Sequence, residues 1–349
     1  MTVAFIGSAG IPNRYGGFES FLEHCAPSIV ERGVPVVVTC DARLYSDRTP
    51  DFKGVHREFI NIPANGAFSV LHDLLAFLRV FSRSQGIVVL GVSGGLWFPL
   101  FRAMCALTGK RLIINVDGVE WRRAKFSVNK RRLLKLFDAL AQWGSHHVIY
   151  DNEGLRAFLT KSAKQKATCI AYPGDHVLHA DNIVQCPGSA LTICRIEPEN
   201  NLELLIDGVL QSRIEKYTIV GNWNHSDYAR TLRLRHSHEP RLRFLDPIYD
   251  PLKLAELRAG CEFYLHGHSV GGTNPSLVEM LFYDCSILCF DVDFNRRTAG
   301  GEASYFASAK DLQRALDTPT PTGGDRRLAR SLYTASTIAD AYLKVIRQR

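Results

Sequence analysis

The sequence predicts an α/β protein made of two doubly wound domains, because short apolar strand-like runs alternate with amphipathic helical stretches and this alternation begins twice. A length of 349 residues suits two domains, and 46% apolar residues suffice for two cores. We expect one Rossmann-like domain over 1–175 and a second over 176–326. A C-terminal segment, 327–349, is expected to pack back toward the first domain as a helix over 327–347.

The expected elements follow this alternation in order. The strands of the first half are 3–6, 36–39, 86–91, 112–116 and 147–150, with helices near 18–32, 69–83, 97–108 and 129–142. The strands of the second half are 190–194, 216–220, 243–245, 261–265 and 286–290. Ligands of open α/β sheets bind outside the carboxyl ends of the strands, so a central cleft faced by both sheets is the expected active site.

The composition of the chain limits the kinds of ligand it can be expected to bind and the cellular compartment in which it is expected. The net charge of +7 favours anionic ligands, although the basic residues are not interleaved with stacking aromatics, which disfavours nucleic acid. The nine cysteines are odd in number and never spaced as C-x-x-C, which indicates reduced thiols rather than disulfides or a zinc site. Met1 leads directly into a strand and no apolar run reaches about 18 residues, so we expect a cytoplasmic protein, soluble or peripheral.

A glycine-rich loop joins the first strand to the first helix. Gly7, Gly10, Gly16 and Gly17 let the backbone approach a ligand, and Arg14 adds a fixed positive charge, so phosphate is the first ligand to consider. The glycines do not fit G-x-G-x-x-G, which disfavours an NAD-dependent oxidoreductase, and no Gly-Lys-Ser/Thr follows them.

The second half contains two further features suited to an anionic ligand. Arg195 ends a strand and can place a forked cation on a diphosphate. The stretch 266–279 is a second strand-to-helix junction, where the backbone N–H groups of Gly271, Gly272 and Thr273 are expected to face the cleft and Pro275 suits a first helical turn.

Seven segments carry a resemblance to a known family: GSAGIPNRYGGFES (7–20), NVDGVEWRRAKF (115–126), CRIEPENNLELL (194–205), VGNW (220–223), LDPIYD (245–250), HGHSVGGTNPSLVE (266–279) and FDVDFNR (290–296). The chain resembles bacterial glycosyltransferases of family 4, and within them the rhamnosyltransferase-like subgroup with an N-terminal DUF1972-type domain. The resemblance implies the two-domain GT-B fold and metal-independent, retaining transfer of a sugar from a nucleotide diphosphate to a lipid-linked acceptor.

The resemblance also implies the donor site. The donor-binding positions are Arg14, Gly16, Gly17, Arg195, Asn222, Ile248, Tyr249, Gly271, Gly272, Thr273, Asn274 and Glu279. Among these, Glu279 matches the second glutamate of the family's E-x7-E pattern and is expected to bind the ribose hydroxyls. The first glutamate is replaced by Gly271, which excludes a carboxylate nucleophile there and favours a front-face, oxocarbenium-like route. Asn200 stands where many members have a lysine.

The expected catalytic residues are Asp117, Arg195 and His268, and the expected acceptor-binding residues are Tyr15, Asp117, Glu120 and Trp121. Asp117 equally fits an Asx turn, and His266 and His268 fit either donor contacts or structural roles. The basic segment 122–137, rich in leucine in its second half, fits either an anionic membrane surface or a solvated basic face over a leucine core stripe.

The function expected on these grounds is transfer of L-rhamnose from dTDP-L-rhamnose to a polyprenyl-diphosphate-linked saccharide at the cytoplasmic face of the inner membrane, without a metal or other cofactor. The residues themselves indicate only a sugar nucleotide. Transfer of a hexose from a UDP- or GDP-sugar, a non-catalytic sugar-nucleotide-binding protein and an NAD-dependent oxidoreductase remain as alternatives.

Overall fold

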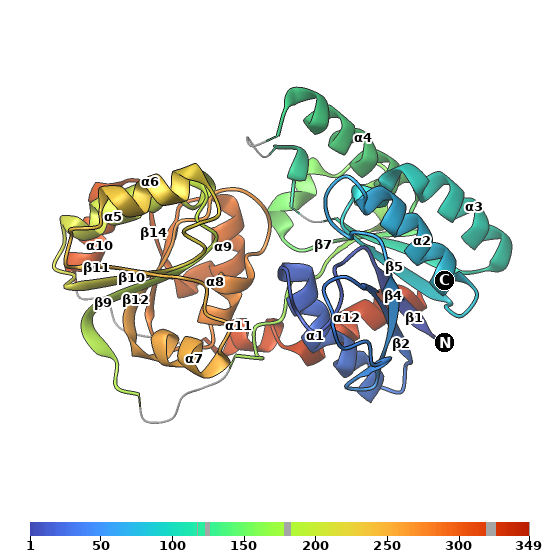
Figure 1. The fold of residues 1–349 in the computed structure, drawn as a ribbon, viewed down its shortest axis with the longest axis horizontal. Coiled ribbons are helices and arrows are strands. Elements are labelled where there is room, and N and C mark those ends of the chain that lie inside the picture. Colours follow the sequence, from blue (N-terminus) through green and yellow to red (C-terminus); the bar gives the residue numbers. More distant parts are fainter. Residues whose placement is uncertain (117, 123–125, 178–182, 319–325, 349) are drawn as a thin grey trace. The chain divides into compact units, whose positions relative to one another are not determined.

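The computed structural model describes residues 1–116, 118–122, 126–177, 183–318 and 326–348. The chain divides into two compact units: unit 1 comprises Met1–Pro173 and Ala335–Arg349, and unit 2 comprises Gly174–Thr334 (Figure 1). Each unit contains a parallel β-sheet with helices between the strands, so the predicted α/β fold class of two Rossmann-like domains is confirmed.

The described residues of unit 1 form an eight-stranded sheet in the order β3-β4-β2-β1-β5-β6-β7-β8. Its strands are β1 (Val3–Ile6), β2 (Val36–Asp41), β3 (Asp51–Phe52), β4 (Val55–Ile60), β5 (Gly86–Leu90), β6 (Arg111–Val116), β7 (His147–Tyr150) and β8 (Ala167–Cys169). Neighbours pair parallel except β3 and β4. The central strands β1 and β5 are buried throughout, as expected of apolar runs covered on both faces.

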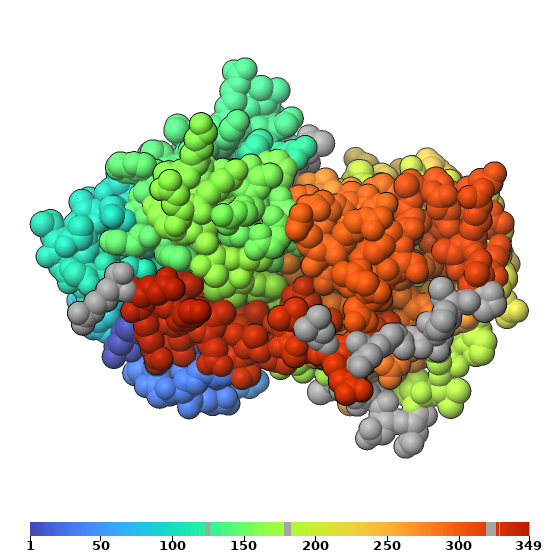
Figure 2. All heavy atoms as spheres, turned by 180° about the vertical axis from the view of Figure 1, so that it is seen from behind, coloured from blue at the N-terminus to red at the C-terminus, as the bar shows by residue number. Residues whose placement is uncertain are grey.

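The long helices of unit 1 are α1 (Gly17–Glu31), α2 (Ser69–Phe81), α3 (Phe98–Thr108), α4 (Val128–Gly144) and α12 (Ala335–Arg347). Helix α1 connects β1 to β2, whereas α2, α3 and α4 make crossovers that advance across the sheet in the opposite direction. Because parallel crossovers are right-handed, α2, α3 and α4 share one face of the sheet and α1 lies on the other. Helix α12 packs beside α1, as the red and blue segments of unit 1 show in Figure 2.

The described residues of unit 2 form a six-stranded, fully parallel sheet in the order β11-β10-β9-β12-β13-β14. Its strands are β9 (Cys186–Ile193), β10 (Lys216–Val220), β11 (Leu242–Leu245), β12 (Cys261–His266), β13 (Ser286–Phe290) and β14 (Ser304–Phe306). Its helices are α5 (Leu202–Leu210), α6 (Asp227–Arg235), α7 (Pro251–Gly260), α8 (Pro275–Met280), α9 (Asp293–Ala299), α10 (Ala309–Asp317) and α11 (Arg327–Leu332). Trp223, fully buried, donates its indole N–H to the Leu245 carbonyl at 3.0 Å and anchors the core at the carboxyl edge.

Three parts of the fold differ from the sequence expectation. Strands β3, β4, β8 and β14 were not predicted, and the single helix expected over 327–347 is two helices, α11 and α12. Of these two, α11 belongs to unit 2 and α12 to unit 1. All nine cysteines are free thiols, and Cys186 is exposed rather than buried.

Candidate functional site

The strand order of unit 2 places a ligand site at the carboxyl edge between β9 and β12. From β9 the chain moves outward to β10 and β11, and then crosses to the other side of β9 to continue with β12, β13 and β14. A ligand of an open parallel sheet binds at such a point of reversal, because the two loops there diverge and leave a crevice. Unit 1 has the same reversal between β1 and β5.

Arg195 lies at this edge of unit 2, two residues after β9. Its side chain is exposed, and within the described residues its guanidinium forms no ion pair or hydrogen bond. Its carbonyl accepts a hydrogen bond from Asn200 Nδ2 at 2.7 Å, which holds the backbone in place. The structure therefore leaves a forked cation exposed at the carboxyl edge of unit 2, where the sequence analysis expects the diphosphate.

Asn200 joins the two loops that flank the point of reversal. The residue is 5% exposed, and its Oδ1 accepts a hydrogen bond from His268 Nδ1 at 2.9 Å while its Nδ2 bonds to Arg195. The N–H and hydroxyl of Ser269 both donate to the Glu199 carbonyl at 2.9 Å. Asn200 is therefore a buried amide that orients the His268 ring and fastens the loop after β12 to the loop after β9.

His268 and Gly271 lie next to each other in the loop after β12. Gly271 has φ +126°, a conformation that disfavours any side chain, and a Cβ placed there would lie 3.3 Å from His268 Nε2. Gly271, which stands where the resemblance implies a first glutamate, thus has a backbone in which a glutamate would be strained. The His268 Nε2 atom therefore lies beside this glycine.

His266 ends β12 and is 3% exposed, and within the described residues its Nε2 has no hydrogen-bond partner. Burial, together with the nearby His268, lowers the pKa of His266 to about 3. His266 is therefore a neutral imidazole of the sheet edge near neutral pH.

Glu279 lies near the end of α8, one turn beyond the Asn274 cap, where Asn274 Oδ1 accepts from the Ser276 N–H at 3.0 Å. Its carboxylate accepts a hydrogen bond from the Arg258 guanidinium of α7, and its Oε1 lies 3.3 Å from His176 Nε2. Arg258 and Glu279 are both nearly buried. A ribose at Glu279 would therefore meet a carboxylate already held by a cation and an imidazole, neither of which the sequence analysis identified.

Three of the expected donor-binding residues lie in the loops after β10 and β11: Asn222 follows β10, and Ile248 and Tyr249 follow β11. The Tyr249 ring is 88% exposed, whereas Ile248 is half-buried and Asn222 uses its Oδ1 to accept from the Asn224 N–H at 3.1 Å. Asp250 then caps α7 by accepting from the N–H groups of Leu252 and Lys253. The exposed Tyr249 ring offers an aromatic face that a base can stack on.

The glycine-rich loop of unit 1 is held by carboxylates of its own helix. Glu19, 3% exposed, accepts a hydrogen bond from the Ala9 N–H at 2.6 Å, and Glu23 accepts one from the Asn13 N–H at 2.7 Å. These two acids were not identified from the sequence, and each takes an N–H group that the phosphate interpretation had left for a ligand. Gly16 caps α1, Gly17 is its first residue, and the side chains of Arg14 and Tyr15 are exposed.

The predicted acceptor region is described in part. Asp117 and the side chain of Glu120 lie outside the described residues, as do Arg123 and Lys125 of the basic segment. Trp121 donates its indole N–H to Asp138 Oδ2 at 3.1 Å, and Gln142 Nε2 donates to Asp138 Oδ1 at 2.7 Å. Burial raises the pKa of Asp138, and the small pocket of about 20 Å³ beside it has room for one water molecule.

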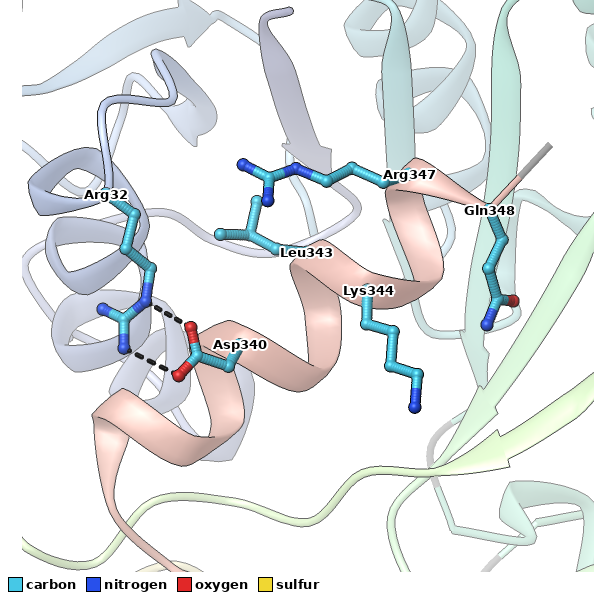
Figure 3. A pocket seen from close by; sticks show the side chains of 6 residues that line it. All are labelled: Arg32, Asp340, Leu343, Lys344, Arg347 and Gln348. Atoms are coloured by element: carbon cyan, nitrogen blue, oxygen red, sulfur yellow. Dashed lines mark hydrogen bonds and ion pairs between the residues drawn. The ribbon is translucent and has the colours of Figure 1, made fainter.

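A larger hollow of about 640 Å³ lies at the amino edge of the unit 1 sheet, the edge opposite the carboxyl ends of its strands (Figure 3). Arg32 and Asp340 form a two-pronged ion pair across it, with Nε to Oδ1 at 2.5 Å and Nη2 to Oδ2 at 3.1 Å. Ile346 of the same helix, α12, meets Gly86 at the start of β5. This hollow is therefore separate from the carboxyl edge of unit 1.

Two searches over the described residues concern metals and membranes. In that part of the chain no three His, Cys, Asp or Glu side chains are grouped so as to hold a metal ion. No described helix has the length and apolar character needed to cross a bilayer.

Solved structures resemble the whole chain. Sucrose-phosphate synthase from Thermosynechococcus elongatus shares 13% identity with a TM-score of 0.78, covering 99% of this chain and 98% of that one. Anabaena HepE, solved with UDP and glucose, shares 14% identity with a TM-score of 0.70, covering 99% of each chain. The lipopolysaccharide outer core galactosyltransferase WaaB shares 12% identity with a TM-score of 0.60, also covering 99% of each. At these identities the likeness shows the fold, the two-domain architecture called GT-B.

No curated protein sequence matches the chain. A family model does: the one described as "Domain of unknown function (DUF1972)" matches residues 1–175, just over half of the sequence. The chain therefore belongs to the DUF1972 family.

Proposed function

We propose that this protein is a retaining glycosyltransferase of family 4 that transfers L-rhamnose from dTDP-L-rhamnose to a lipid-linked saccharide. The proposal rests on one observation above all: Arg195 is exposed at the point of strand reversal in unit 2 and its guanidinium has no partner among the described residues. The fold is shared over the full length with HepE, which was solved with UDP and glucose. A leaving diphosphate gains charge as the glycosidic bond breaks, and a fixed guanidinium stabilises that charge. WaaB, of the same fold, is a galactosyltransferase of the lipopolysaccharide outer core.

In this proposal, the residues around Arg195 have separate tasks. Tyr249 stacks on the base, Glu279 accepts hydrogen bonds from the ribose, and the N–H groups at Gly271, Gly272 and Thr273 bind the diphosphate. His268, held by Asn200, contacts the donor sugar. Gly271 supplies no carboxylate, so the sugar passes through an oxocarbenium-like state and the leaving phosphate takes the proton of the acceptor hydroxyl on the same face.

The acceptor and the compartment complete the proposal. Tyr15, Asp117, Glu120 and Trp121 are assigned to the saccharide acceptor, and Asp117 is proposed to assist the proton transfer. Arg195 and the backbone N–H groups neutralise the diphosphate, so no metal cofactor is proposed. The acceptor is a polyprenyl-diphosphate-linked saccharide at the cytoplasmic face of the inner membrane, which the basic segment 122–137 contacts.

A thermal-shift panel tests the donor. The panel contains dTDP-rhamnose, UDP-glucose, UDP-N-acetylglucosamine, GDP-mannose, the bare nucleotides and NAD. A ligand that binds only the folded state stabilises it by about 2.7 kcal/mol at a concentration of 100 Kd, so we expect the largest rise in Tm with dTDP-rhamnose. We also expect Arg195→Ala to weaken donor binding at least tenfold, about 1.4 kcal/mol, through loss of a charge-assisted contact.

Arg243→Ala removes another exposed arginine of unit 2 and is the matched control, with donor affinity expected to stay within twofold. A larger shift with UDP- or GDP-sugars would replace the proposed donor, and a shift with NAD alone would replace the reaction class. Equal donor affinity in Arg195→Ala and the unsubstituted protein would contradict the role given to Arg195.

A further inference from the structure

The outer face of the helix layer formed by α2, α3 and α4 in unit 1 is unusually apolar. These three helices lie on one face of the sheet, and the turn of 3₁₀-helix Ser93–Trp97 contacts all of them (Figure 1). Each helix already buries one stripe against the sheet. The buried residues include Phe77 of α2, Phe98 and Phe101 of α3, and Phe137 and Ala141 of α4.

Each of these helices carries a second apolar stripe on its outer side. The stripes are Phe68, Leu71, Leu75 and Leu78 at α2; Leu96, Leu100, Ala103 and Leu107 at α3; and Leu133, Leu136, Leu140 and Trp143 on α4. The spacing of three or four residues places the members of a stripe on one side of their helix. Most of these side chains are exposed, Leu107 by 87% and Trp143 by 63%. An apolar surface of this extent on a soluble domain marks an interaction site.

The charge on this face has one sign. Within α2, α3 and α4 the basic residues are Arg79, Arg102, Lys130, Arg131, Arg132 and Lys135. Arg79 is paired with Glu58 of β4, and the others have no carboxylate partner among the described residues. The two acidic residues of these helices do not face solvent: Asp73 is fully buried, and Asp138 is turned to Trp121 and Gln142.

This combination identifies the partner by its chemistry. On this face leucine and tryptophan lie beside cations that have no carboxylate partner among the described residues, apart from Arg79. Such a face fits the boundary between anionic headgroups and acyl chains, where tryptophan is favoured and each cation is attracted to the surface charge. An apolar contact with another protein would not explain why these cations lack a carboxylate partner among the described residues.

We propose that the outer face of α2, α3 and α4, which we name the apolar-basic face, lies flat on an anionic lipid surface, with its leucines and Trp143 in the acyl boundary and the cations of α4 among the headgroups. This proposal rests on the proposed function, which already includes contact between the segment 122–137 and a membrane. It extends that contact from the segment 122–137 to three helices. It concerns unit 1 alone and is tested without donor or acceptor.

The direction of α4 gives this face a use in the proposed reaction. A helix that follows a parallel strand begins at the carboxyl edge of the sheet, so Lys130, Arg131, Arg132 and Lys135 occupy the half of α4 nearest that edge. Trp121, assigned to the acceptor, contacts this half through the hydrogen bond between Arg131 Nε and its carbonyl at 2.9 Å. The lipid surface would therefore border the acceptor region.

Sedimentation with lipid vesicles tests the face. We expect the full chain to bind vesicles of phosphatidylcholine and phosphatidylglycerol in a 3:1 ratio at least tenfold more tightly than vesicles of phosphatidylcholine alone. A charge variant combines Lys130→Gln, Arg131→Gln, Arg132→Gln and Lys135→Gln, and an apolar variant combines Leu100→Ser, Leu107→Ser, Leu136→Ser and Trp143→Ser. Each is expected to bind the anionic vesicles at least tenfold more weakly, and both alter exposed side chains only, so the fold should be retained.

Unit 2 provides matched controls. Lys216→Gln, Arg243→Gln, Lys253→Gln and Lys310→Gln together remove the same charge from exposed positions, and Leu234→Ser with Leu252→Ser removes exposed leucines. Both controls should bind within twofold of the unsubstituted protein. An equal loss in the charge control would mean that only the net charge of +7 matters, which overturns the proposal.

A dimer in sedimentation velocity that the apolar variant abolishes, with unchanged vesicle binding, would assign the face to a second copy instead. Loss of vesicle binding with a normal donor shift, or the reverse, separates this proposal from the proposed donor chemistry.

Discussion

At the scale of single residues, Gly271 shows how a missing side chain can determine the chemistry of a site. Its φ of +126° lies where side chains are disfavoured, and His268 Nε2 stands close to the place a Cβ would take. A glutamate at this position would have to change the loop that Asn200 and Ser269 fasten to the loop after β9. The absence of a carboxylate here is thus part of the local backbone geometry, and the proposed front-face route follows from it.

Replacement of this glycine by alanine should therefore cost stability. We expect Gly271→Ala to lower the free energy of unfolding by about 1–3 kcal/mol, because the new Cβ forces a strained backbone and crowds His268. Gly301→Ala is the control, since its φ is not left-handed and its Cβ would meet nothing within 4 Å. Its effect should stay within about 0.5 kcal/mol. Urea unfolding followed by circular dichroism measures both, and equal stabilities would contradict the strain at Gly271.

At the scale of elements, one nearly buried ion pair, between Arg258 and Glu279, joins α7 to α8. Glu279 also lies beside His176 and is the residue assigned to the ribose. Removing one member of such a pair is more damaging than replacing both, because the remaining charge is left without a partner in a poorly solvated place. A loss of donor binding in a Glu279 variant therefore has to be separated from a loss of the helix packing.

Paired substitutions make this separation. We expect Glu279→Ala to lower the free energy of unfolding by about 3–5 kcal/mol, and the double variant Glu279→Ala with Arg258→Met to regain most of that stability. Denaturant unfolding measures the stabilities, and calorimetry with the donor measures the affinities. If Glu279 binds the ribose, the stable double variant still binds the donor more weakly than the unsubstituted protein. Full affinity in the double variant would reduce Glu279 to a structural residue.

At the scale of the whole molecule, the parts predicted from the sequence are those with strong local signals. The apolar runs of β1 and β5 and the periodicity of α1 to α4 gave the alternation of strands and helices, and hence the fold class. Strand β4 was missed because its sequence does not alternate: three polar residues, 56–58, follow Val55 in a row, and the middle one, Arg57, is buried under hydrogen bonds to the carbonyls of Thr49 and Ile11. Periodicity cannot distinguish a buried arginine from an exposed one.

The candidate site could be predicted only where a residue is placed by its position after a strand, as Arg195 is. Long-range partners were invisible: Arg258 lies 21 positions from Glu279, and the roles of Asn200 and Asp138 depend on which loops and helices meet. The leucines of segment 122–137 illustrate the same limit. The sequence did not decide which apolar residues of this segment face the core and which face outward. The structure places Leu133 and Leu136 at the surface but Phe137 in the core.

The C-terminal helix follows unit 2 in the sequence but is part of unit 1, and this arrangement can be tested by truncation. Helix α12 ends the sequence but belongs to unit 1, where it buries Ile338, Tyr342, Leu343 and Ile346. Tyr342 packs on Phe21 with ring centroids 5.0 Å apart, and its hydroxyl accepts from Asn115 Nδ2 at 2.6 Å. The Arg32–Asp340 pair adds a tie to α1.

Truncation after Thr334 should therefore unfold unit 1, which contains the N-terminal half of the sequence, rather than unit 2, which directly precedes the cut. Each of the buried side chains that α12 contributes stabilises the fold by about 1.5–3 kcal/mol, and together they approach the total stability of a domain, about 5–15 kcal/mol. We expect hydrogen exchange measured by mass spectrometry to show lost protection in β1, β2 and α1 while β9 to β13 of unit 2 stay protected. A truncation that removes only residues 348–349 is the control and should leave both units protected. Lost protection confined to unit 2, or none at all, would contradict the assignment of α12 to the core of unit 1.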